Sequence, residues 1–532
     1  MHKTFRASMT WLHTWCGLLL GWLLYAIFVT GTASYYRPEI TQWMQPELRP
    51  HVAAPSVLLE RALAEVRRQA PDATTIYIRF PSDRDPGLQL NWETPDGKRT
   101  TKVVDAETAR LTARDSRGGE FFYRFHFQLQ LPYPWGRFIA CIAAAFMLVA
   151  LFTGIVAHRQ FFKDFFTFRP SKPGARSWLD AHNLAGVIAL PFYFMIAYSA
   201  QIMLLDMFMP WSRMATEPPA LVADAPQKPA KIPSGDSTRT AGDSVVAPTA
   251  KPALPAPLPV AAMAKAYALK HGDTPLAWLY ASGLGTPAAR LSLGPGAGRG
   301  IAYNSAGTVN LDAVTGVPIP EDVSQRGAFA KLHDTLYGLH MVRFARPALR
   351  GLFFFLGLLG TLLVATGLIM WSVKRRKRQE SLHGPGRAGF GHALVERLNI
   401  TTIVGFPLAL ASIFWANRLL PVGMEARGDR EVGVVFVVWS LALLHACVRP
   451  AWKAWREQLI VASGLFGLLP FLDALTTPAA STRLVFNLGL LSFGGVFAWA
   501  ALRVSARARS RTVSRDHEND HSTAENTPEV TA

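Results

Sequence analysis

Long apolar runs alternate with polar inserts along this chain, and the alternation predicts membrane-spanning helices. The first four runs lie within 1–35, 136–158, 179–205 and 348–373, and four more follow within 400–503. A helix needs about 20 apolar residues to cross the hydrocarbon core of a bilayer. Most of these runs approach or exceed that length, so the pattern predicts an all-α integral membrane bundle of about eight spans.

The two long inserts between the spans have a mixed pattern. In 36–135, apolar positions at helical spacing predict a helix over 54–69, and strand-like segments follow at 74–80, 87–93 and 98–104. The insert 206–347 contains a tether rich in Pro, Ala and Ser, 217–259, then a predicted helix at 260–270 and further strand-like segments. We therefore expect two small α+β modules, one in each insert, and an internal duplication of span, module and span.

Basic residues gather beside the apolar runs. They occupy the predicted loops 159–178 and 374–399, the loop 449–456, and the tail 504–532. Because cytoplasmic loops are enriched in Lys and Arg, both termini are predicted to be cytoplasmic and both inserts to lie outside the cytoplasm. This placement accounts for the net charge of +18 without nucleic-acid binding, which we exclude. The last four spans carry few ionisable groups, and the tail is expected to be disordered.

Three cysteines, all within apolar runs, form no CxxC or CxxCH motif. The sequence therefore indicates neither a cysteine metal site nor covalently attached haem.

Histidines near the span ends are the candidate chemistry of this chain. A polar residue in a membrane helix usually faces a partner or a cofactor, although a single histidine is more simply explained by a hydrogen bond to a neighbouring helix. The pattern of several histidines changes this interpretation. His13 and His182 each precede a glycine by four residues and lie at a similar distance beyond a basic residue, whereas His126 and His340 each precede a span that contains Thr-Gly near its end.

Two pairs of imidazoles at two depths are what two stacked b-type haems require as axial ligands. We predict His13 with His182 near the cytoplasmic face, and His126 with His340 near the outer face. Zinc is a poorer explanation, because zinc sites usually hold more ligands, often cysteine or carboxylate.

Other side chains near the spans are weaker candidates than these four. His158 and His333 remain alternative ligands; since neither has a counterpart in the other repeat, we expect surface or supporting roles. Arg137 and Arg343 are candidates for haem propionates or an anionic ligand, although interfacial anchoring is the simpler explanation. Packing or interfacial roles are expected for His392 and His445.

Short motifs recur in a matching order: WLHTWCG (11–17) with TG (30–31), FHFQLQLP (125–132) with TG (153–154), AHNLAG (181–186), and GLH (338–340) with TG (366–367). In this order and duplication the chain resembles the PepSY-associated transmembrane family, also called PiuB-like, over about residues 9–375. The resemblance implies PepSY-like modules in the periplasm and a place in the bacterial inner membrane. Similar members act as haem-containing reductases of ferric siderophores, and the matching histidines here are His13, His126, His182 and His340. The last four spans lie outside the shared pattern.

We therefore expect an inner-membrane haem protein that reduces ferric siderophore iron in the periplasm. No GxGxxG motif follows a predicted strand, so the electron donor is expected to be a separate flavoprotein reductase or a quinol. Two alternatives stay open: a membrane-anchored binding or sensor protein that regulates a peptidase, and a transporter, which the parallel repeats would suit.

Overall fold

The computed structural model describes residues 4–48, 54–106, 114–158, 175–209, 258–296, 300–302, 307–320, 327–384, 389–478 and 481–524. They form two compact units. The helical unit comprises Met1–Pro46, Ala113–Tyr198 and Arg346–Ala532, and the sheet unit comprises Glu47–Thr112 and Ser199–Ala345. Most of the predicted tether, 217–259, lies outside the described residues.

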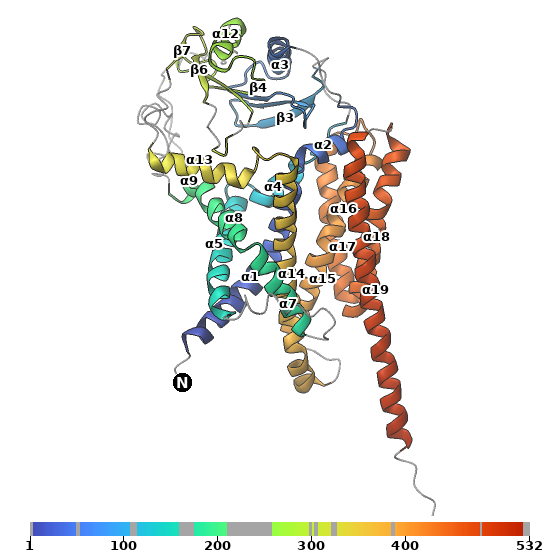
Figure 1. The fold of residues 1–532 in the computed structure, drawn as a ribbon. Coiled ribbons are helices and arrows are strands. Elements are labelled where there is room, and N and C mark those ends of the chain that lie inside the picture. Colours follow the sequence, from blue (N-terminus) through green and yellow to red (C-terminus); the bar gives the residue numbers. More distant parts are fainter. Residues whose placement is uncertain are drawn as a thin grey trace, which may run out of the picture. The chain divides into compact units, whose positions relative to one another are not determined.

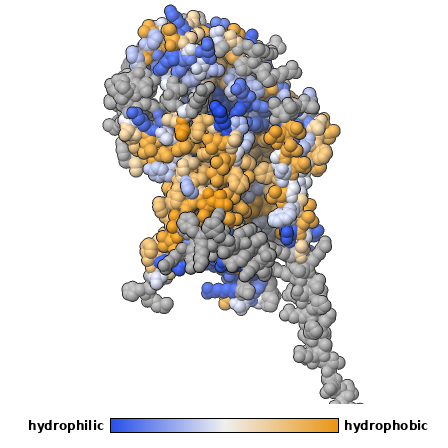
Figure 2. Space-filling view, viewed as in Figure 1, coloured by the Kyte–Doolittle hydropathy of each residue, from blue (hydrophilic) through white to orange (hydrophobic). Residues whose placement is uncertain are grey.

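The helical unit contains the predicted membrane spans. Among the described residues, seven helices are long and apolar enough to cross a membrane, or eight if one bent pair counts as a single span. Exposed apolar side chains gather over these helices (Figure 2), as expected where a surface faces lipid. The expectation of a multi-pass bundle of about eight spans is confirmed. In chain order the spans are α1 (Phe5–Ser34), α5 (Trp135–Ala157), the pair α7 (Ala175–Ile188) and α8 (Leu190–Met203), α14 (Pro347–His383), the pair α15 (Phe390–Ile400) and α16 (Phe406–Leu419), α17 (Arg427–Val448), α18 (Ala451–Thr476) and α19 (Ser481–Ala524).

Two of these spans are interrupted helices. α7 and α8 meet at a bend of 68°, just before Pro191, which has no N–H to donate and crowds the preceding turn. The Tyr193 hydroxyl donates to the Ala185 carbonyl at the bend, at 3.1 Å. Between α15 and α16, the π-helical turn η3 (Thr401–Gly405) leaves backbone carbonyls for side chains of other helices. The Ile403 carbonyl accepts from the Tyr25 hydroxyl at 2.9 Å, which attaches this span to α1.

Helix ends differ from the sequence predictions in two places. The loop predicted at 374–399 is largely helical, because α14 continues to His383 and α15 begins at Phe390. In the tail predicted to be disordered, residues 504–524 continue α19, and 525–532 lie outside the described residues. Lysine and arginine in 374–378, and alanine and arginine in 501–511, are strong helix formers, and this local preference favours the extension of each helix beyond its apolar part.

The sheet unit contains one antiparallel sheet built from both inserts. β1 (Thr75–Arg79), β2 (Leu88–Glu93) and β3 (Arg99–Val104) come from the first insert; β4 (Leu276–Ser282), β5 (Arg290–Pro295), β6 (Val309–Asp312) and β7 (Pro318–Ile319) come from the second. Their order is β3-β2-β1-β4-β5-β6-β7. The predicted strands of the first insert are confirmed nearly to the residue, but the two inserts do not form separate sheets. β1 pairs with β4, with Tyr77 opposite Tyr280, because the first strand of each meander would otherwise be an open edge.

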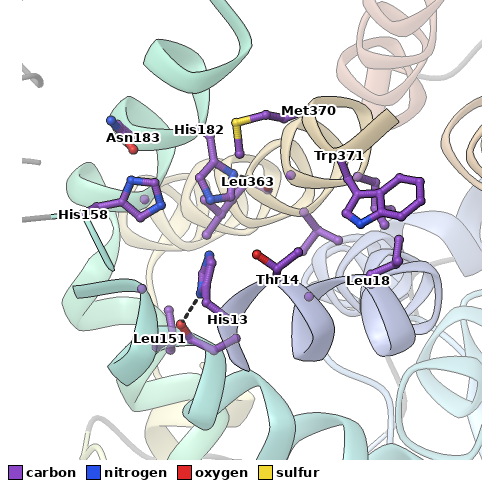
Figure 3. A pocket seen from close by; sticks show the side chains of 18 of the residues that line it. His13, Thr14, Leu18, Leu151, His158, His182, Asn183, Leu363, Met370 and Trp371 are labelled. Atoms are coloured by element: carbon purple, nitrogen blue, oxygen red, sulfur yellow. Dashed lines mark hydrogen bonds between the residues drawn. The ribbon is translucent and has the colours of Figure 1, made fainter. Parts of the chain in front are cut away.

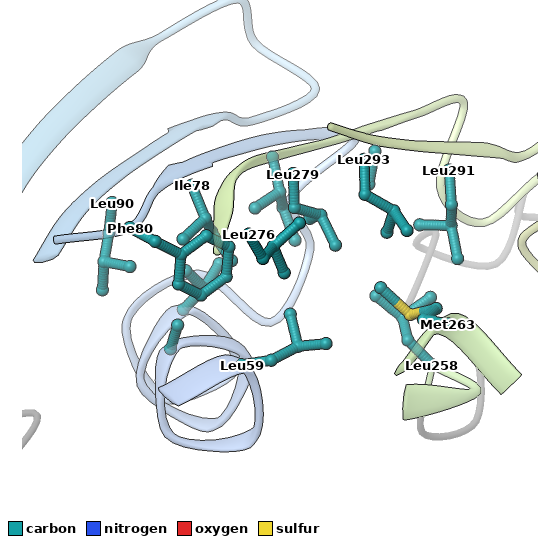
Figure 4. Packing of buried hydrophobic residues seen from close by; sticks show 14 of the residues in the cluster. Leu59, Ile78, Phe80, Leu90, Leu258, Met263, Leu276, Leu279, Leu291 and Leu293 are labelled. Carbon is teal, nitrogen blue, oxygen red and sulfur yellow. The ribbon is translucent and has the colours of Figure 1, made fainter. Parts of the chain in front are cut away.

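One helix from each insert covers the same face of this sheet. They are α3 (Pro55–Gln69) and α12 (Val260–His271), and both confirm predicted helices. Figure 4 shows Leu59 of α3 and Met263 of α12 directed at the apolar side chains of the strands. Ile78 and Leu279, register partners at the β1–β4 seam, are fully buried. The first insert therefore contributes a helix followed by three antiparallel strands, and the second contributes a helix followed by four.

Candidate functional site

A cavity of about 540 Å³ lies within the helical unit, lined by residues of α1, α5, α7, α8 and α14. α1 packs against α5 and α14, and α14 packs against α7 (Figure 1). The cavity walls are mostly apolar, and three histidine side chains point into it (Figure 3). Three basic side chains near the end of α14 complete the lining: Lys374, Arg375 and Arg378. A cavity of this size, mainly apolar with a few polar groups, is the usual form of a cofactor site.

The three imidazoles are those of His13, His158 and His182. One ring nitrogen of each lies within 4.8 Å of the others. The ring centres of His13 and His158 are 5.8 Å apart, those of His158 and His182 are 6.1 Å apart, and those of His13 and His182 are 6.3 Å apart. Across the part of the chain that the structure describes, no other cluster of three or more His, Cys, Asp or Glu side chains is close enough to hold a metal ion.

Backbone carbonyls orient two of these rings. Nδ1 of His13 lies 2.8 Å from the Ala150 carbonyl oxygen, and Nδ1 of His182 lies 3.0 Å from that of Leu363. A carbonyl oxygen can only accept, so each Nδ1 carries the proton and donates it. Nε2 then keeps its lone pair, which is the arrangement typical of metal-ligating histidines. His13 and His182 are therefore prepared to ligate a metal through Nε2.

The Thr-Gly pairs of the spans are the places where these rings pack. A Cβ added to Gly154 would lie 3.0 Å from Cε1 of His13, and one added to Gly367 would lie 3.2 Å from Cε1 of His182. In each pair the threonine hydroxyl donates to the carbonyls three and four residues earlier. The carbonyl three residues earlier is the same one that accepts from the histidine. Glycine thus leaves room for a ring, and the adjacent turn supplies its acceptor.

His126, on the short helix α4 (Glu120–Gln128), has the same arrangement at the third Thr-Gly pair. Its Nδ1 lies 2.9 Å from the Ile27 carbonyl, and a Cβ on Gly31 would lie 2.5 Å from that nitrogen. The Thr30 hydroxyl donates to the same Ile27 carbonyl. Burial lowers the pKa of His126, partly opposed by the hydrogen bond to Ile27.

His340, on α13 (Ala328–Met341) of the sheet unit, contacts a hydroxyl at the matching position. Its Nδ1 lies 2.8 Å from Oγ of Ser199. Ser199 follows His182 by the same interval at which Thr30 follows His13, so a serine stands where the other three positions have threonine. Three of the four predicted histidines therefore contact the carbonyl three residues before a threonine, and His340 contacts the hydroxyl of the serine that stands at the threonine position. The structure brings His13 and His182 together, and the outer pair stays a prediction.

The cavity position of His158 was not foreseen from the sequence, which suggested a surface or supporting role. A signal was nevertheless present. His158 follows Gly154 by four residues, which places both on one helix face, and Gly154 packs against His13. Because His158 has no counterpart in the other repeat, comparison of the repeats did not indicate that it lies beside His13.

The remaining histidines near spans take part in contacts elsewhere. His333 lies 3.4 Å from the carboxylate of Asp334. His392 is buried with Nε2 3.1 Å from the Ser372 carbonyl, and Nε2 of His445 lies 2.8 Å from Glu457. Arg137, a candidate for an anionic ligand, donates to Gln128 Oε1 at 3.2 Å.

Buried ion pairs in the last four spans are a further feature that the sequence did not reveal. Asp473 of α18 accepts from Arg418 at 2.8 Å and from Arg483 at 3.2 Å. Arg427 and Glu431 form a second pair, with both side chains fully buried. Arg418 also donates to the carbonyl of Trp43, on α2 (Arg37–Met44), which fastens the extra spans to the rest of the helical unit. From the sequence these charges lie near span ends and resemble ordinary interfacial residues.

Comparison with known proteins identifies a family match over the part of the chain that contains the cavity. The family described as PepSY-associated TM region matches residues 10–374. The match includes the three cavity histidines, His126 and His340, and ends on α14, before the last four spans. No curated protein matches the chain.

Proposed function

Because the chain belongs to the PepSY-associated TM region family, we propose that it is an inner-membrane haem protein that reduces ferric siderophore iron in the periplasm. The observation that carries this proposal is the pair of imidazoles, His13 and His182, held in one apolar cavity with each Nδ1 on a carbonyl. The reductase activity and its substrate come from the resemblance described above.

The cavity residues fit a b-type haem. Two nitrogens on opposite sides of one metal lie about 4 Å apart, at metal–nitrogen bonds of about 2 Å, and the ring nitrogens of His13 and His182 lie within 4.8 Å. Gly17 and Gly186 line the cavity, and a Cβ on Gly17 would meet no atom within 4 Å, so a flat macrocycle has room beside α1.

The polar end of the cavity suits the carboxylates of such a group. Lys374, Arg375 and Arg378 line that end, and basic side chains bind carboxylates through charge-assisted hydrogen bonds. An apolar slot with a basic end matches the amphipathic shape of haem. When bound, haem supplies one-electron redox chemistry; the chain's own residues ligate, orient and shield it from water.

A second haem would be held by His126 and His340 near the outer face. Supporting this, His126 makes the same carbonyl contact as His13 and His182, and His340 contacts Ser199, which stands at the position of the threonine in the other Thr-Gly pairs. The same helix-and-meander order in both inserts supports an internal duplication, which would generate two equivalent sites. Arg137 and Arg343 remain candidates for the propionates of this second haem.

Reduction is a chemically sensible way to release iron from a siderophore. Hard oxygen donors hold ferric iron tightly, and they bind the softer ferrous ion more weakly. One electron therefore releases the metal and leaves the chelator intact. The donor on the cytoplasmic side would be a flavoprotein reductase or a quinol, and both inserts would lie in the periplasm.

The test uses purified protein reconstituted in lipid, with its haem reduced under anaerobic conditions. Addition of a ferric siderophore should oxidise the haem and produce ferrous iron in equal amount. The gallium complex of the same siderophore is the matched control, because gallium(III) has the charge of the ferric ion but accepts no electron under these conditions. Haem that stays reduced with several ferric siderophores contradicts the substrate assignment.

A second candidate function rests on the third imidazole. Three histidines within 4.8 Å of one another resemble the ligand set of a metal-ion site, which would suit a metal transporter. That protein would be colourless and would bind one transition-metal ion per chain at this cluster. The peptidase-regulating alternative would also be colourless, but it would bind peptides tightly.

A further inference from the structure

His158 lies where the end of α5 meets the cavity. It is the C-cap residue of that helix, and its backbone N–H donates to the Gly154 carbonyl at 2.9 Å. Gly154 is also the residue against which the His13 ring packs. The side chain of His158 is half-buried and points toward the other two imidazoles (Figure 3).

Ring distances alone do not separate His158 from the predicted ligands. An imidazole centre lies about 3 Å from a metal that it ligates, so two rings on opposite sides have centres about 6 Å apart. The three separations in the cluster are 5.8, 6.1 and 6.3 Å. Any two of the three rings are therefore spaced to hold one iron between them.

The surroundings of the rings do separate them. His13 and His182 each pack on the glycine of a Thr-Gly pair and donate to the carbonyl three residues before its threonine. His158 instead caps a helix, outside this repeated arrangement. A haem iron would take two axial imidazoles, so only two of the three rings could ligate it at one time. His158 is the one of the three that lies at a helix end and packs on no Thr-Gly pair in the described contacts.

We propose that His158 is a reserve axial ligand of the inner haem, able to take the place of His182 or His13. This inference rests on the proposed haem function. In the exchange, one iron–nitrogen bond to the departing imidazole would break and one to a ring nitrogen of His158 would form, with no change in oxidation state. The site thus keeps six-coordinate iron when one of its two oriented ligands is lost.

The test compares the low-spin haem signal, by electron paramagnetic resonance and optical spectra, in purified full-length variants. His182→Ala and His13→Ala should each keep the low-spin signal of both haems. His158→Ala alone should also keep it. The double variants His158→Ala/His182→Ala and His158→Ala/His13→Ala should each lose half of the low-spin signal. Added imidazole should restore it, which shows that the fold is intact.

His126→Ala is the matched control, because no three-histidine group surrounds His126 among the described residues. It should lose half of the low-spin signal as a single variant. The proposal is overturned if His182→Ala and His13→Ala each lose as much signal as the corresponding double variant. That result would not contradict the proposed haem function. Wild-type protein without haem would contradict both the haem function and the role proposed for His158.

Discussion

Replacing Gly31 with alanine perturbs the contact between the His126 ring and α1. Gly31 lies on α1, and the His126 ring packs directly over it. An added Cβ would lie 2.5 Å from Nδ1 and 2.6 Å from Cε1 of that ring. Ordinary contacts of this kind lie at 3.4–4 Å, so the ring must retreat by about 1 Å, or the helices must separate, as in an overpacked core.

The cost follows from two opposing effects. Overpacking costs about 1–3 kcal/mol, and losing the hydrogen bond from His126 Nδ1 to Ile27 adds about 0.5–1.5 kcal/mol. Alanine is a better helix former than glycine and returns about 1 kcal/mol. We therefore expect Gly31→Ala to destabilise the protein by about 0.5–3.5 kcal/mol, and to move the ring away from its proposed ligating position.

The assay measures three properties of the purified Gly31→Ala variant: its haem content, its low-spin haem signal and its thermal stability. Gly464→Ala, on α18, is the matched control, because its new Cβ meets no atom within 4 Å; it should keep both haems and gain slight stability. Gly154→Ala and Gly367→Ala should have milder effects on the inner haem, since their closest contacts are 3.0 and 3.2 Å. If Gly31→Ala behaves like Gly464→Ala in haem content and stability, the packing argument for His126 is wrong.

Four further predictions address the cavity, the sheet, a pKa and the topology. Gly17→Leu should fold normally but exclude the inner haem, because its side chain would enter the cavity; normal haem content would contradict the proposed placement. Tyr77→Cys/Tyr280→Cys should form a disulfide, since register partners lie within disulfide range, and failure to crosslink under oxidising conditions would argue against the joined sheet. Because burial holds the folded pKa of His126 below its unfolded value, haem-free protein should lose stability as the pH falls below about 6.5, and the loss should shrink in His126→Gln; an unchanged profile would contradict this. A cysteine at Asp96, in the exposed turn between β2 and β3, should react with an impermeant reagent in intact spheroplasts, and protection there would reverse the topology.

The spans and the candidate ligands could be predicted because both depend on local patterns. An apolar run needs only its own length to indicate a membrane helix, and the matching positions of His13 and His182 indicated that these two rings lie close together, as the structure shows. The reason for the Thr-Gly pairs became visible only in three dimensions. The ring that uses Gly154 comes from α1, and the ring that uses Gly367 comes from α7.

Three features depended on contacts between distant segments and could not be read from the sequence. β1 and β4 pair across an interval of nearly 200 residues, and neither strand alone indicates its partner. His158 enters the cavity because α5 ends beside α1 and α7. The Arg427–Glu431 pair is buried and hydrogen-bonds to Asp115, Ser116 and Asn417, although its sequence position resembles an exposed helix start.

The most direct test of the haem assignment is the haem content of purified wild-type protein beside that of His13→Ala/His182→Ala. We predict two b-type haems per chain in the wild type, both low-spin, and the loss of half of the low-spin signal in the double variant, which retains only one of the three cavity imidazoles. Wild-type protein without haem, or a double variant with both low-spin signals intact, would contradict the assignment of this cavity.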